Sequence, residues 1–416
     1  MKTVQEASDL SLNKAGQKTI YPILFMICFS HLLNDLMQSI IPSVYPIIKD
    51  KYNFSFTQIG AITFTYQITA SILQPFVGFY TDRKPQPFSL PLAMIFTMGG
   101  IVALSFANHF YFFLGAVALI GLGSSIFHPE SSRVAYMASG GRKGLAQSIF
   151  QLGGHAGTSI GPLLAALIVI PFGQFSLLFF CLAAFTGMLI LRRISKWYQD
   201  NLRLRAKKIS NQNQLYAEGI SRNRILLSIA ILLLLLFSKY IYMASMTNYF
   251  TFYLIDTFNV SAQHSQYYLF LFLAAIAVGT MIGGPVGDRI GRKYVIWFSI
   301  LGVAPFTLLL PYMSLTWTVI LAILIGLILS SAFSAIMLYA TDLIPGKIGT
   351  IAGLFYGFMF GIAGIGSAVL GWLADKTSIT YIFSICSYLP LIGIIAVFLP
   401  GIKSPEPPPV KWNAKK

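Results

Sequence analysis

The sequence predicts an all-α polytopic membrane protein with twelve transmembrane helices in two pseudo-symmetric six-helix bundles. Three observations lead to this prediction. Only 10% of the 416 residues are charged and 56% are hydrophobic, whereas a soluble domain carries about 25% charged residues. Apolar runs of about 20 residues, long enough to cross the hydrocarbon core as a helix, recur along the chain. The two halves of the chain also share a repeated motif.

The predicted spans cover nearly the whole chain. Gly (35 residues) and Pro (20 residues) occur inside them, which is compatible with helices because packed neighbours satisfy the freed backbone groups. The first span carries polar side chains and lacks a small-residue cleavage site, so we expect a mature helix there and not a signal peptide. The spans are 21–48, 56–80, 88–107, 110–137, 145–170, 174–196, 225–255, 263–287, 294–313, 316–343, 348–373 and 378–399.

The Lys and Arg residues predict the orientation of these spans. With the N-terminus inside, most of the 29 basic residues fall in cytoplasmic loops and tails, as the positive-inside rule requires. Only Lys49, Lys51 and Lys376 fall outside. The formal charge of +16 therefore indicates membrane topology and not nucleic-acid binding, and we expect both termini to be cytoplasmic.

A polar stretch divides the chain into two parts. Residues 197–223 are rich in Lys, Arg, Asn and Gln and are predicted to form a cytoplasmic linker. Residues 1–196 would then form the N-terminal six-helix bundle with its cytoplasmic tail, and residues 224–400 the C-terminal bundle. Residues 401–416, rich in Pro and Lys, are expected to form a disordered cytoplasmic tail.

The repeat lies between the second and third helix of each half. GFYTDR at residues 78–83 matches GPVGDR at residues 284–289, and Gly157 in the fifth span matches Gly366. Two parallel halves of this kind are one of the transporter architectures, with a substrate site between them near the middle of the membrane.

The second copy of the repeat carries a family resemblance. Gly284-x-x-x-Asp288-Arg289-x-Gly291-Arg292-Lys293 resembles the cytoplasmic loop signature of the major facilitator superfamily, whose twelve-helix layout matches the entire chain. The first copy departs from this signature, because Lys84-Pro-Gln-Pro87 follows Asp82-Arg83. In the fifth span, Gly157-Thr-Ser-Ile-Gly161-Pro162 is similar to a signature of drug/proton antiporters in that superfamily.

Four longer segments resemble the fosmidomycin-resistance proteins of bacterial inner membranes. They are residues 30–39, 127–154, 237–245 and 283–297. The resemblance implies export of a small phosphonate antibiotic across the bacterial inner (plasma) membrane. It also implies a transporter that is driven by the proton gradient, uses no cofactor or metal, and functions as a monomer.

Polar residues follow one face of the first span. His31, Asn34, Asp35 and Gln38 are spaced so that they lie on the same side of a helix. Ionisable groups at membrane depth are costly and are candidates for function, so we expect this face to meet an aqueous cavity. The alternative is a fixed network of hydrogen bonds between helices.

The fourth span contributes a second carboxylate. Glu130 and Arg133 are three residues apart and can pair on one helical face. Burial in a low-dielectric cavity favours the protonated form of a carboxylate. Asp35 is therefore our first candidate for the proton carrier and Glu130 the second, with Arg133 as a participant in proton coupling.

The fifth span separates a polar stripe from a stripe of small residues. Gln151 and His155 belong to the polar stripe and are candidates for substrate binding, with an interhelical hydrogen bond as the alternative for His155. Gly157 and Gly161, followed by Pro162, lie about 200° around the helix. Small residues allow a neighbouring helix to approach closely, and such contacts are also where helices slide.

A lysine occurs inside the seventh span. Lys239 and Tyr242 share a helical face and are expected to face the cavity. We expect Asp35 to be the counter-ion of Lys239, with an anionic substrate as the alternative partner. An anion would also find donors in His31 and Arg133, and charge-assisted hydrogen bonds of this kind are strong.

The repeated loops are predicted to control the conformational change. Asp82 and Asp288 each lie at a helix C-terminus, where a carboxylate is unfavourable against the helix dipole, so a partner on another helix is expected. Ordinary positive-inside topology with a tight glycine turn is the alternative. The predicted gating residues are Gly78, Asp82, Arg83, Gly157, Gly161, Pro162, Gly284, Asp288, Arg289, Gly291 and Arg292.

These observations predict proton-coupled efflux, by alternating access, of a small and anionic drug such as fosmidomycin. The alternative is a proton-coupled importer of a small organic or phosphorylated metabolite, because fold and charge layout do not depend on the direction of transport. An enzyme would need a nucleophile or metal motif, and the sequence contains no HExxH or paired-Cys site. A channel would not need duplicated gating loops.

Overall fold

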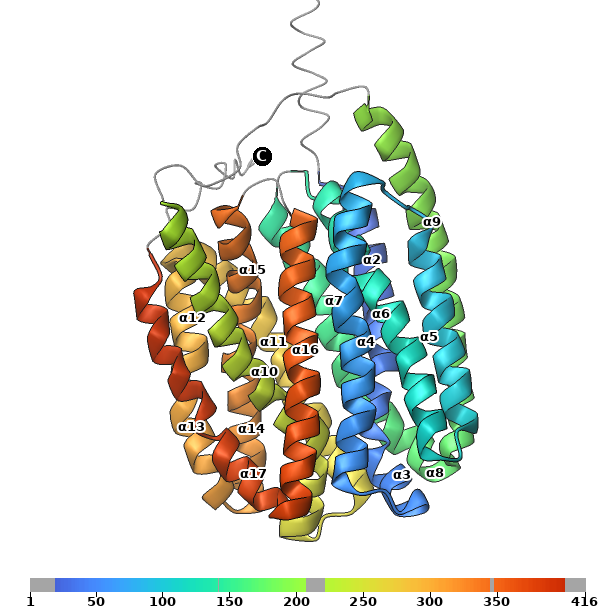
Figure 1. Cartoon of the computed structure of the whole chain (residues 1–416), viewed down its shortest axis with the longest axis vertical. Helices are drawn as coiled ribbons and strands as arrows, with labels where there is room; N and C mark the ends of the chain where they lie inside the picture. The colour runs from blue at the N-terminus through green and yellow to red at the C-terminus, as the bar shows by residue number, and fades with distance from the viewer. Residues whose placement is uncertain (1–18, 141, 207–220, 345–347, 401–416) are drawn as a thin grey trace, which may run out of the picture.

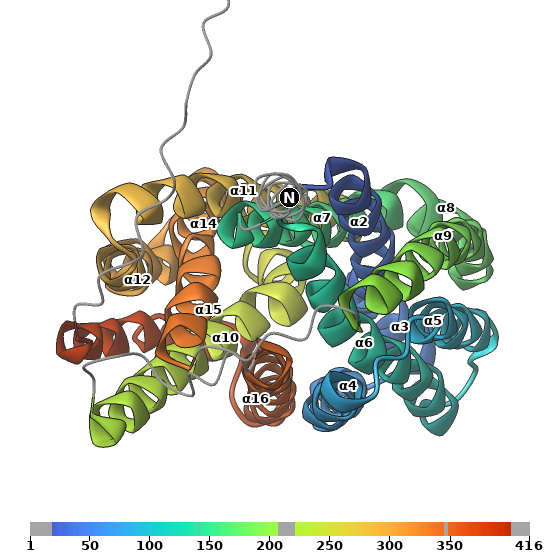
Figure 2. The ribbon, with the colours of Figure 1, turned by 90° about the horizontal axis from the view of Figure 1, so that it is seen from above.

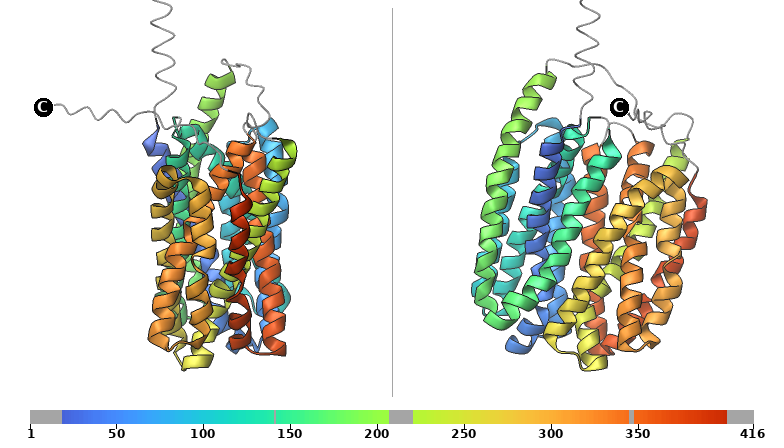
Figure 3. Two further views of the ribbon diagram at one scale, coloured as in Figure 1. Left: turned by 90° about the vertical axis from the view of Figure 1, so that its left-hand side faces the viewer. Right: turned by 180° about the vertical axis from the view of Figure 1, so that it is seen from behind.

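The computed structural model describes residues 19–140, 142–206, 221–344 and 348–400, and the regular structure within these ranges is helical throughout. The long helices run side by side along the longest axis of the molecule (Figure 1). Helices α2–α9 gather on one side and α10–α17 on the other, and α4 and α16 meet where the two groups join (Figures 1 and 2). Views from the side and from behind show the same arrangement (Figure 3).

The helices of the first half begin and end within a few residues of the predicted spans, with one exception. The last of them continues to Ala206, so it extends into the stretch predicted as a linker. The elements are α2 (Tyr21–Ser43), α3 (Tyr45–Tyr52), α4 (Phe56–Arg83), α5 (Ser89–Phe106), α6 (Phe110–Ala138), α7 (Lys143–Leu164), the π-helix η1 (Ala165–Val169), α8 (Ile170–Phe172), the 3-10 helix η2 (Gln174–Phe180) and α9 (Cys181–Ala206).

The second half is interrupted as often as the first. Its elements are α10 (Arg222–Phe258), α11 (Ala262–Ile290), α12 (Arg292–Leu301), α13 (Ala304–Leu309), η3 (Leu310–Tyr312), α14 (Leu315–Ser330), α15 (Ala332–Leu343), α16 (Ile348–Lys376), α17 (Ile379–Cys386) and η4 (Leu389–Phe398). The break between α12 and α13 precedes Pro305, and the break between α2 and α3 precedes Pro46. Proline lacks an N–H and clashes with the carbonyl four residues earlier, which explains both breaks.

Eleven helical stretches among the described residues are long and apolar enough to cross a membrane. The chain is therefore a multi-pass membrane protein. Helix α4 is not one of the eleven, although it has 28 residues. Its polar side chains, which include Thr63, Gln67 and Gln74, lower its mean hydropathy.

Close helix contacts occur where glycines lie. A Cβ atom added at Gly153 would lie 2.0 Å from the carbonyl oxygen of Cys28, and one at Gly157 would lie 2.1 Å from that of Leu32. The glycine stripe of the fifth span therefore packs α7 directly against α2, as predicted. Between the halves, a Cβ at Gly60 of α4 would lie 2.7 Å from a backbone oxygen of α16. Small residues at these positions allow the backbones to meet.

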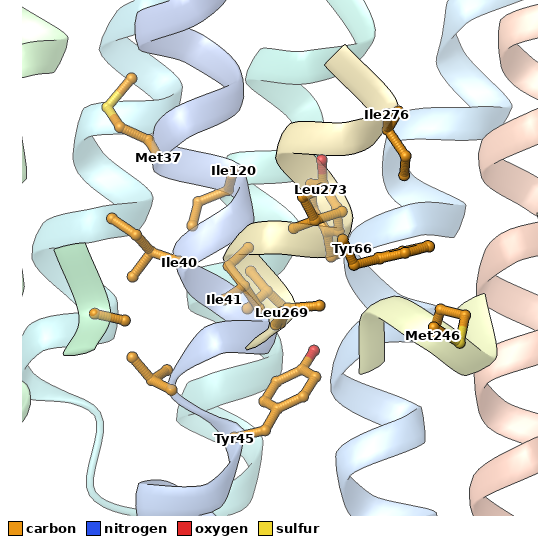
Figure 4. Packing of buried hydrophobic residues seen from close by; sticks show 14 of the residues in the cluster. Met37, Ile40, Ile41, Tyr45, Tyr66, Ile120, Met246, Leu269, Leu273 and Ile276 are labelled. Carbon is orange, nitrogen blue, oxygen red and sulfur yellow. The ribbon is translucent and has the colours of Figure 1, made fainter. Parts of the chain in front are cut away.

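Apolar side chains from both halves fill the space between these contacts. Figure 4 shows Met37 and Ile40 of α2 and Tyr66 of α4 in one packed cluster with Met246 of α10 and Leu269 of α11. Tyr66 and Leu269 of this cluster also line a cavity at the junction of the two halves.

Candidate functional site

A cavity of about 170 Å³ lies between the two halves. Its walls come from α2, α3, α4, α7, α10, α11 and α16, so both halves contribute. The polar side chains at its surface include Asp35, Gln38, Thr63, Gln67 and Asn248. Of the polar residues that lower the hydropathy of α4, Thr63 and Gln67 face this cavity.

Asp35 is the acidic residue that faces the cavity, and its side chain is 17% exposed. Its Oδ2 atom lies 3.2 Å from Nε2 of His31, and its Oδ1 atom lies 3.4 Å from Nε2 of His128. Asn34 donates a hydrogen bond to Oδ1 at 3.0 Å. His31, Asp35 and His128 are called the Asp35 cluster below. Their ligand atoms lie within 4.8 Å of one another, a spacing at which a cation can be shared.

The other polar groups of the cavity form two short chains. Tyr66 donates a hydrogen bond to Oε1 of Gln38, and Ser124 donates to the same atom at 3.4 Å. Nearer the end at which α4 begins, Tyr45 and Thr63 are hydrogen-bonded, and Thr63 donates to Asn248 of α10 at 3.5 Å. The second chain therefore crosses from one half to the other.

Lys239 is buried but has no carboxylate partner among the described residues. Its Nζ atom lies 5.5 Å from the ring centroid of Tyr240 and 5.8 Å from that of Phe333. The expected ion pair with Asp35 is not formed, because both carboxylate oxygens of Asp35 face histidines instead. Lys239 is close enough to His155 to influence it electrostatically. Lys239 supplies the positive charge beside the cavity.

Several predicted binding residues do not line the cavity. His31, Asn34, Gln151, His155, Lys239 and Tyr242 are absent from its wall, whereas Asp35, Gln38 and Pro162 are present. Gln151 instead accepts a hydrogen bond from Tyr356 of α16 at 2.9 Å, and Gln147 donates to Tyr356 at 3.3 Å. This contact joins α7 of the first half to α16 of the second. Nε2 of His155 is buried without a hydrogen-bond partner in the described structure.

Glu130 and Arg133 pair as predicted, at 3.5 Å, and Glu130 is fully buried. They lie away from the cavity wall. Arg133 donates hydrogen bonds to the carbonyl oxygens of Thr81 and Gly78 and, at 2.9 Å, to the hydroxyl of Thr81. Its guanidinium thus binds the last carbonyl groups of α4, where a positive charge is favourable.

Part of the predicted gating set lies outside the described side chains. This applies to Asp82, Gly284, Asp288 and Arg289, so their contacts stay predictions. Arg83 is exposed and stacks over the ring of Phe79. Gly291 has a φ of 98° between α11 and α12, a backbone conformation that favours glycine. Arg292, at the start of α12, forms an ion pair with Asp342 of α15.

A contact that was not predicted joins the halves at the end where α4 begins. The carboxylate of Asp375, near the end of α16, accepts hydrogen bonds from the backbone N–H of Phe56 at 3.0 Å and of Thr57 at 2.7 Å. The hydroxyl of Thr57 donates to the same carboxylate. A carboxylate at a helix N-terminus is favourable, so Asp375 holds the two helices together at this end.

We expect Asp375→Ala to shift the protein toward conformations that open at the α3 end. Because Asp375 is exposed, the lost contact should be worth about 1 kcal/mol, roughly a fivefold change in the open population. The measurement is the rate at which a membrane-impermeant maleimide labels a Thr247→Cys variant, since Thr247 lines the cavity. Asp50→Asn, an exposed carboxylate on α3, is the control. Equal labelling rates in all backgrounds would contradict the prediction.

Sequence reasoning missed His128, Tyr66, Tyr356 and Asp375. The low hydropathy of the second span was a usable signal for Tyr66 and its neighbours. The direction of His128 could not be deduced, because Pro129 follows it inside α6. Nothing in the sequence pointed to Asp375, which becomes significant only through its contact with the start of α4.

Comparisons with known proteins identify the class to which this fold and cavity belong. The profile of the Major Facilitator Superfamily matches residues 27–364 and 234–416. The chain belongs to this superfamily of transporters, as its loop signature predicted. It is a transporter of small molecules and not an enzyme.

Two relatives match nearly the full length. The chain is 54% identical over 396 residues to the fosmidomycin resistance protein of Escherichia coli (strain K12), covering 95% of this chain and 97% of that protein. It is 43% identical over 393 residues to the uncharacterized MFS-type transporter YfnC of Bacillus subtilis (strain 168), covering 94% and 96%. The predicted similarity to fosmidomycin-resistance proteins is thus confirmed.

Proposed function

We propose that this protein exports fosmidomycin or a similar small anionic compound in exchange for protons, by alternating access. The observation that carries this proposal is the near full-length similarity to a relative named for fosmidomycin resistance. The buried Lys239 without a carboxylate partner and the cavity-facing Asp35 support it. Lys239 can bind an anion and Asp35 can bind a proton, and the two residues belong to opposite halves of the molecule.

The proposed architecture has twelve membrane spans, with α4 as the span beyond the eleven apolar stretches, in two pseudo-symmetric bundles. Its packing along α16 and the polar side chains that it turns to the cavity support this role. We place the protein in the bacterial inner membrane as a monomer, with both termini and the end of α9 in the cytoplasm. No cofactor takes part, and the proton gradient supplies the energy.

The exchange requires that substrate and proton exclude each other at one site. In the proposed cycle, the halves move so that Lys239, which does not line the cavity in this structure, binds the anionic group of the substrate. A hydrogen-bond donor of the substrate then binds the Asp35 carboxylate. Protonation converts that carboxylate from an acceptor to a donor, so a proton arriving from outside displaces the substrate. The Asp375 and Tyr356 contacts break and re-form as the two ends open in turn. In this scheme Glu130 pairs with Arg133, which binds the end of α4. Asp35 carries the proton.

The test of this function is transport of fosmidomycin by the purified full-length chain in proteoliposomes. With the membrane potential clamped at zero, a pH gradient should drive fosmidomycin against its own gradient and in the direction opposite to proton movement. Growth of a susceptible strain on fosmidomycin should improve when the chain is expressed. Co-movement of protons and substrate would favour the importer, and absence of any pH-driven movement would reject the proposal.

We expect Lys239→Met to weaken fosmidomycin binding. Methionine keeps most of the volume but removes the charge, and a hydrogen bond to a charged group is worth roughly 1.5–3 kcal/mol. Affinity should therefore fall by about tenfold to a hundredfold, measured as the Kd of the purified protein. Lys239→Arg, which keeps the charge, should lose less. An unchanged Kd in Lys239→Met would show that Lys239 does not contact the anion.

A further inference from the structure

The hydrogen bonds of His31 determine which of its nitrogens carries hydrogen. Nδ1 of His31 lies 2.7 Å from the carbonyl oxygen of Phe150. A carbonyl oxygen only accepts, so Nδ1 must donate. The imidazole is also stacked on the Phe150 ring, with centroids 4.0 Å apart. These contacts fix the ring, and Nε2 faces Oδ2 of Asp35.

His128 is held in the same way from a different helix. Its Nδ1 atom lies 3.1 Å from the carbonyl oxygen of Ser124, one turn earlier in α6. The hydroxyl of Ser124 also lies 3.2 Å from Nδ1, but it donates its hydrogen to Gln38. Both Ser124 oxygens therefore face Nδ1 as acceptors, and Nδ1 donates here as well. Nε2 of His128 then faces Oδ1 of Asp35 at 3.4 Å. Both histidines direct their remaining nitrogen at the same carboxylate.

Each of these two contacts places an imidazole lone pair opposite a carboxylate oxygen. Two acceptors at this separation repel unless a proton lies between them, and burial strengthens the repulsion. Only Asp35 of the three faces the cavity. Protons that enter through the cavity can therefore reach both contacts by way of the Asp35 carboxylate.

We propose that the Asp35 cluster binds two exchangeable protons, one at each Nε2···Oδ contact, and that His128 provides the second proton site. This inference rests on the proposed antiport function and specifies its stoichiometry. Two protons enter from outside in each cycle and leave to the cytoplasm, one from each contact. The doubly loaded cluster carries one net positive charge, and the empty cluster one net negative charge.

Several other ionisable groups lie around the cluster. Glu130 of α6 is paired with Arg133, near Tyr198 of α9. Helix α5 carries no ionisable side chain. The groups close enough to act on the cluster are Tyr66 of α4, His155 of α7 and Tyr356 of α16, with Lys239 of α10 acting on His155.

The test measures the fosmidomycin gradient that a pH difference of one unit sustains in proteoliposomes at zero membrane potential. Each coupled proton supports about a tenfold gradient of substrate, whose own charge contributes nothing at zero potential. The wild-type chain should therefore reach about a hundredfold, and His128→Gln about tenfold. His264→Gln, an exposed histidine on α11, should match the wild type.

The outcomes separate this inference from the proposed function. A tenfold gradient in the wild type, or the same gradient in His128→Gln and wild type, would overturn the second proton site while leaving antiport intact. A second readout is the number of protons that the purified protein releases per fosmidomycin bound in weak buffer, which should fall from two to one in His128→Gln. Tight Zn²⁺ binding that is lost in both His128→Gln and His31→Gln would assign the cluster to a metal instead and would also overturn the proposal.

Discussion

Asp35→Asn is expected to abolish the accumulation of substrate driven by a pH gradient. Asparagine has nearly the same shape as aspartate and keeps one of its two acceptor oxygens, but it cannot be ionised. Without the carboxylate, protons on His31 or His128 would lose their counter-ion in a buried site, and an unpaired buried charge is costly. A pH difference of one unit supplies about 1.4 kcal/mol per coupled proton, and the variant should convert none of it.

The measurement is the steady-state ratio of the fosmidomycin concentrations on the two sides of the proteoliposome membrane. This ratio should be about one in Asp35→Asn and about one hundred per pH unit in the wild type. Exchange of internal for external fosmidomycin should continue, because it needs no net proton movement. Asp256→Asn, an exposed carboxylate on α10, serves as the control. If Asp35→Asn still accumulated substrate in response to pH, the proton carrier would be another residue, with Glu130 the next candidate.

The helical architecture could be predicted because it follows from local sequence. Apolar runs determine the helices, and loop charges determine the expected orientation, so most helix ends were placed within a few residues. The exception was the sixth span, where α9 continues to Ala206. Its last turns are polar, and a polar sequence beyond the membrane does not distinguish a helix from a linker.

The site was less accessible to prediction because its pairings cross between helices. The face formed by His31, Asn34, Asp35 and Gln38 was predicted from spacing alone. Sequence spacing could not reveal that His128 of α6, and not Lys239 of α10, would meet Asp35. That choice depends on how α2 and α6 pack, and the packing depends on contacts such as the glycine stripe of α7.

The glycine stripe leads to the second large effect, since Gly157→Leu is expected to prevent folding. The first added atom, Cβ, would already lie 2.1 Å from the carbonyl oxygen of Leu32, and a backbone atom of α2 cannot move aside without shifting the helix that carries Asp35. Overpacking of this kind costs about 3 kcal/mol or more, a large share of the roughly 5–15 kcal/mol that stabilises a folded protein.

The failure of Gly157→Leu to fold is measured as the yield of monodisperse protein after detergent extraction. The apparent Tm of the extracted protein is the second measurement. Gly115→Leu is the matched control, because a Cβ atom at Gly115 of α6 has no neighbour within 4 Å and should be tolerated. Gly157→Ala should already lower the Tm, since the clash begins at Cβ. A Gly157→Leu protein with normal yield and Tm would mean that α2 and α7 are not in direct backbone contact. In that case the position of His31 and Asp35 opposite α7, on which the proton site depends, would have to be revised.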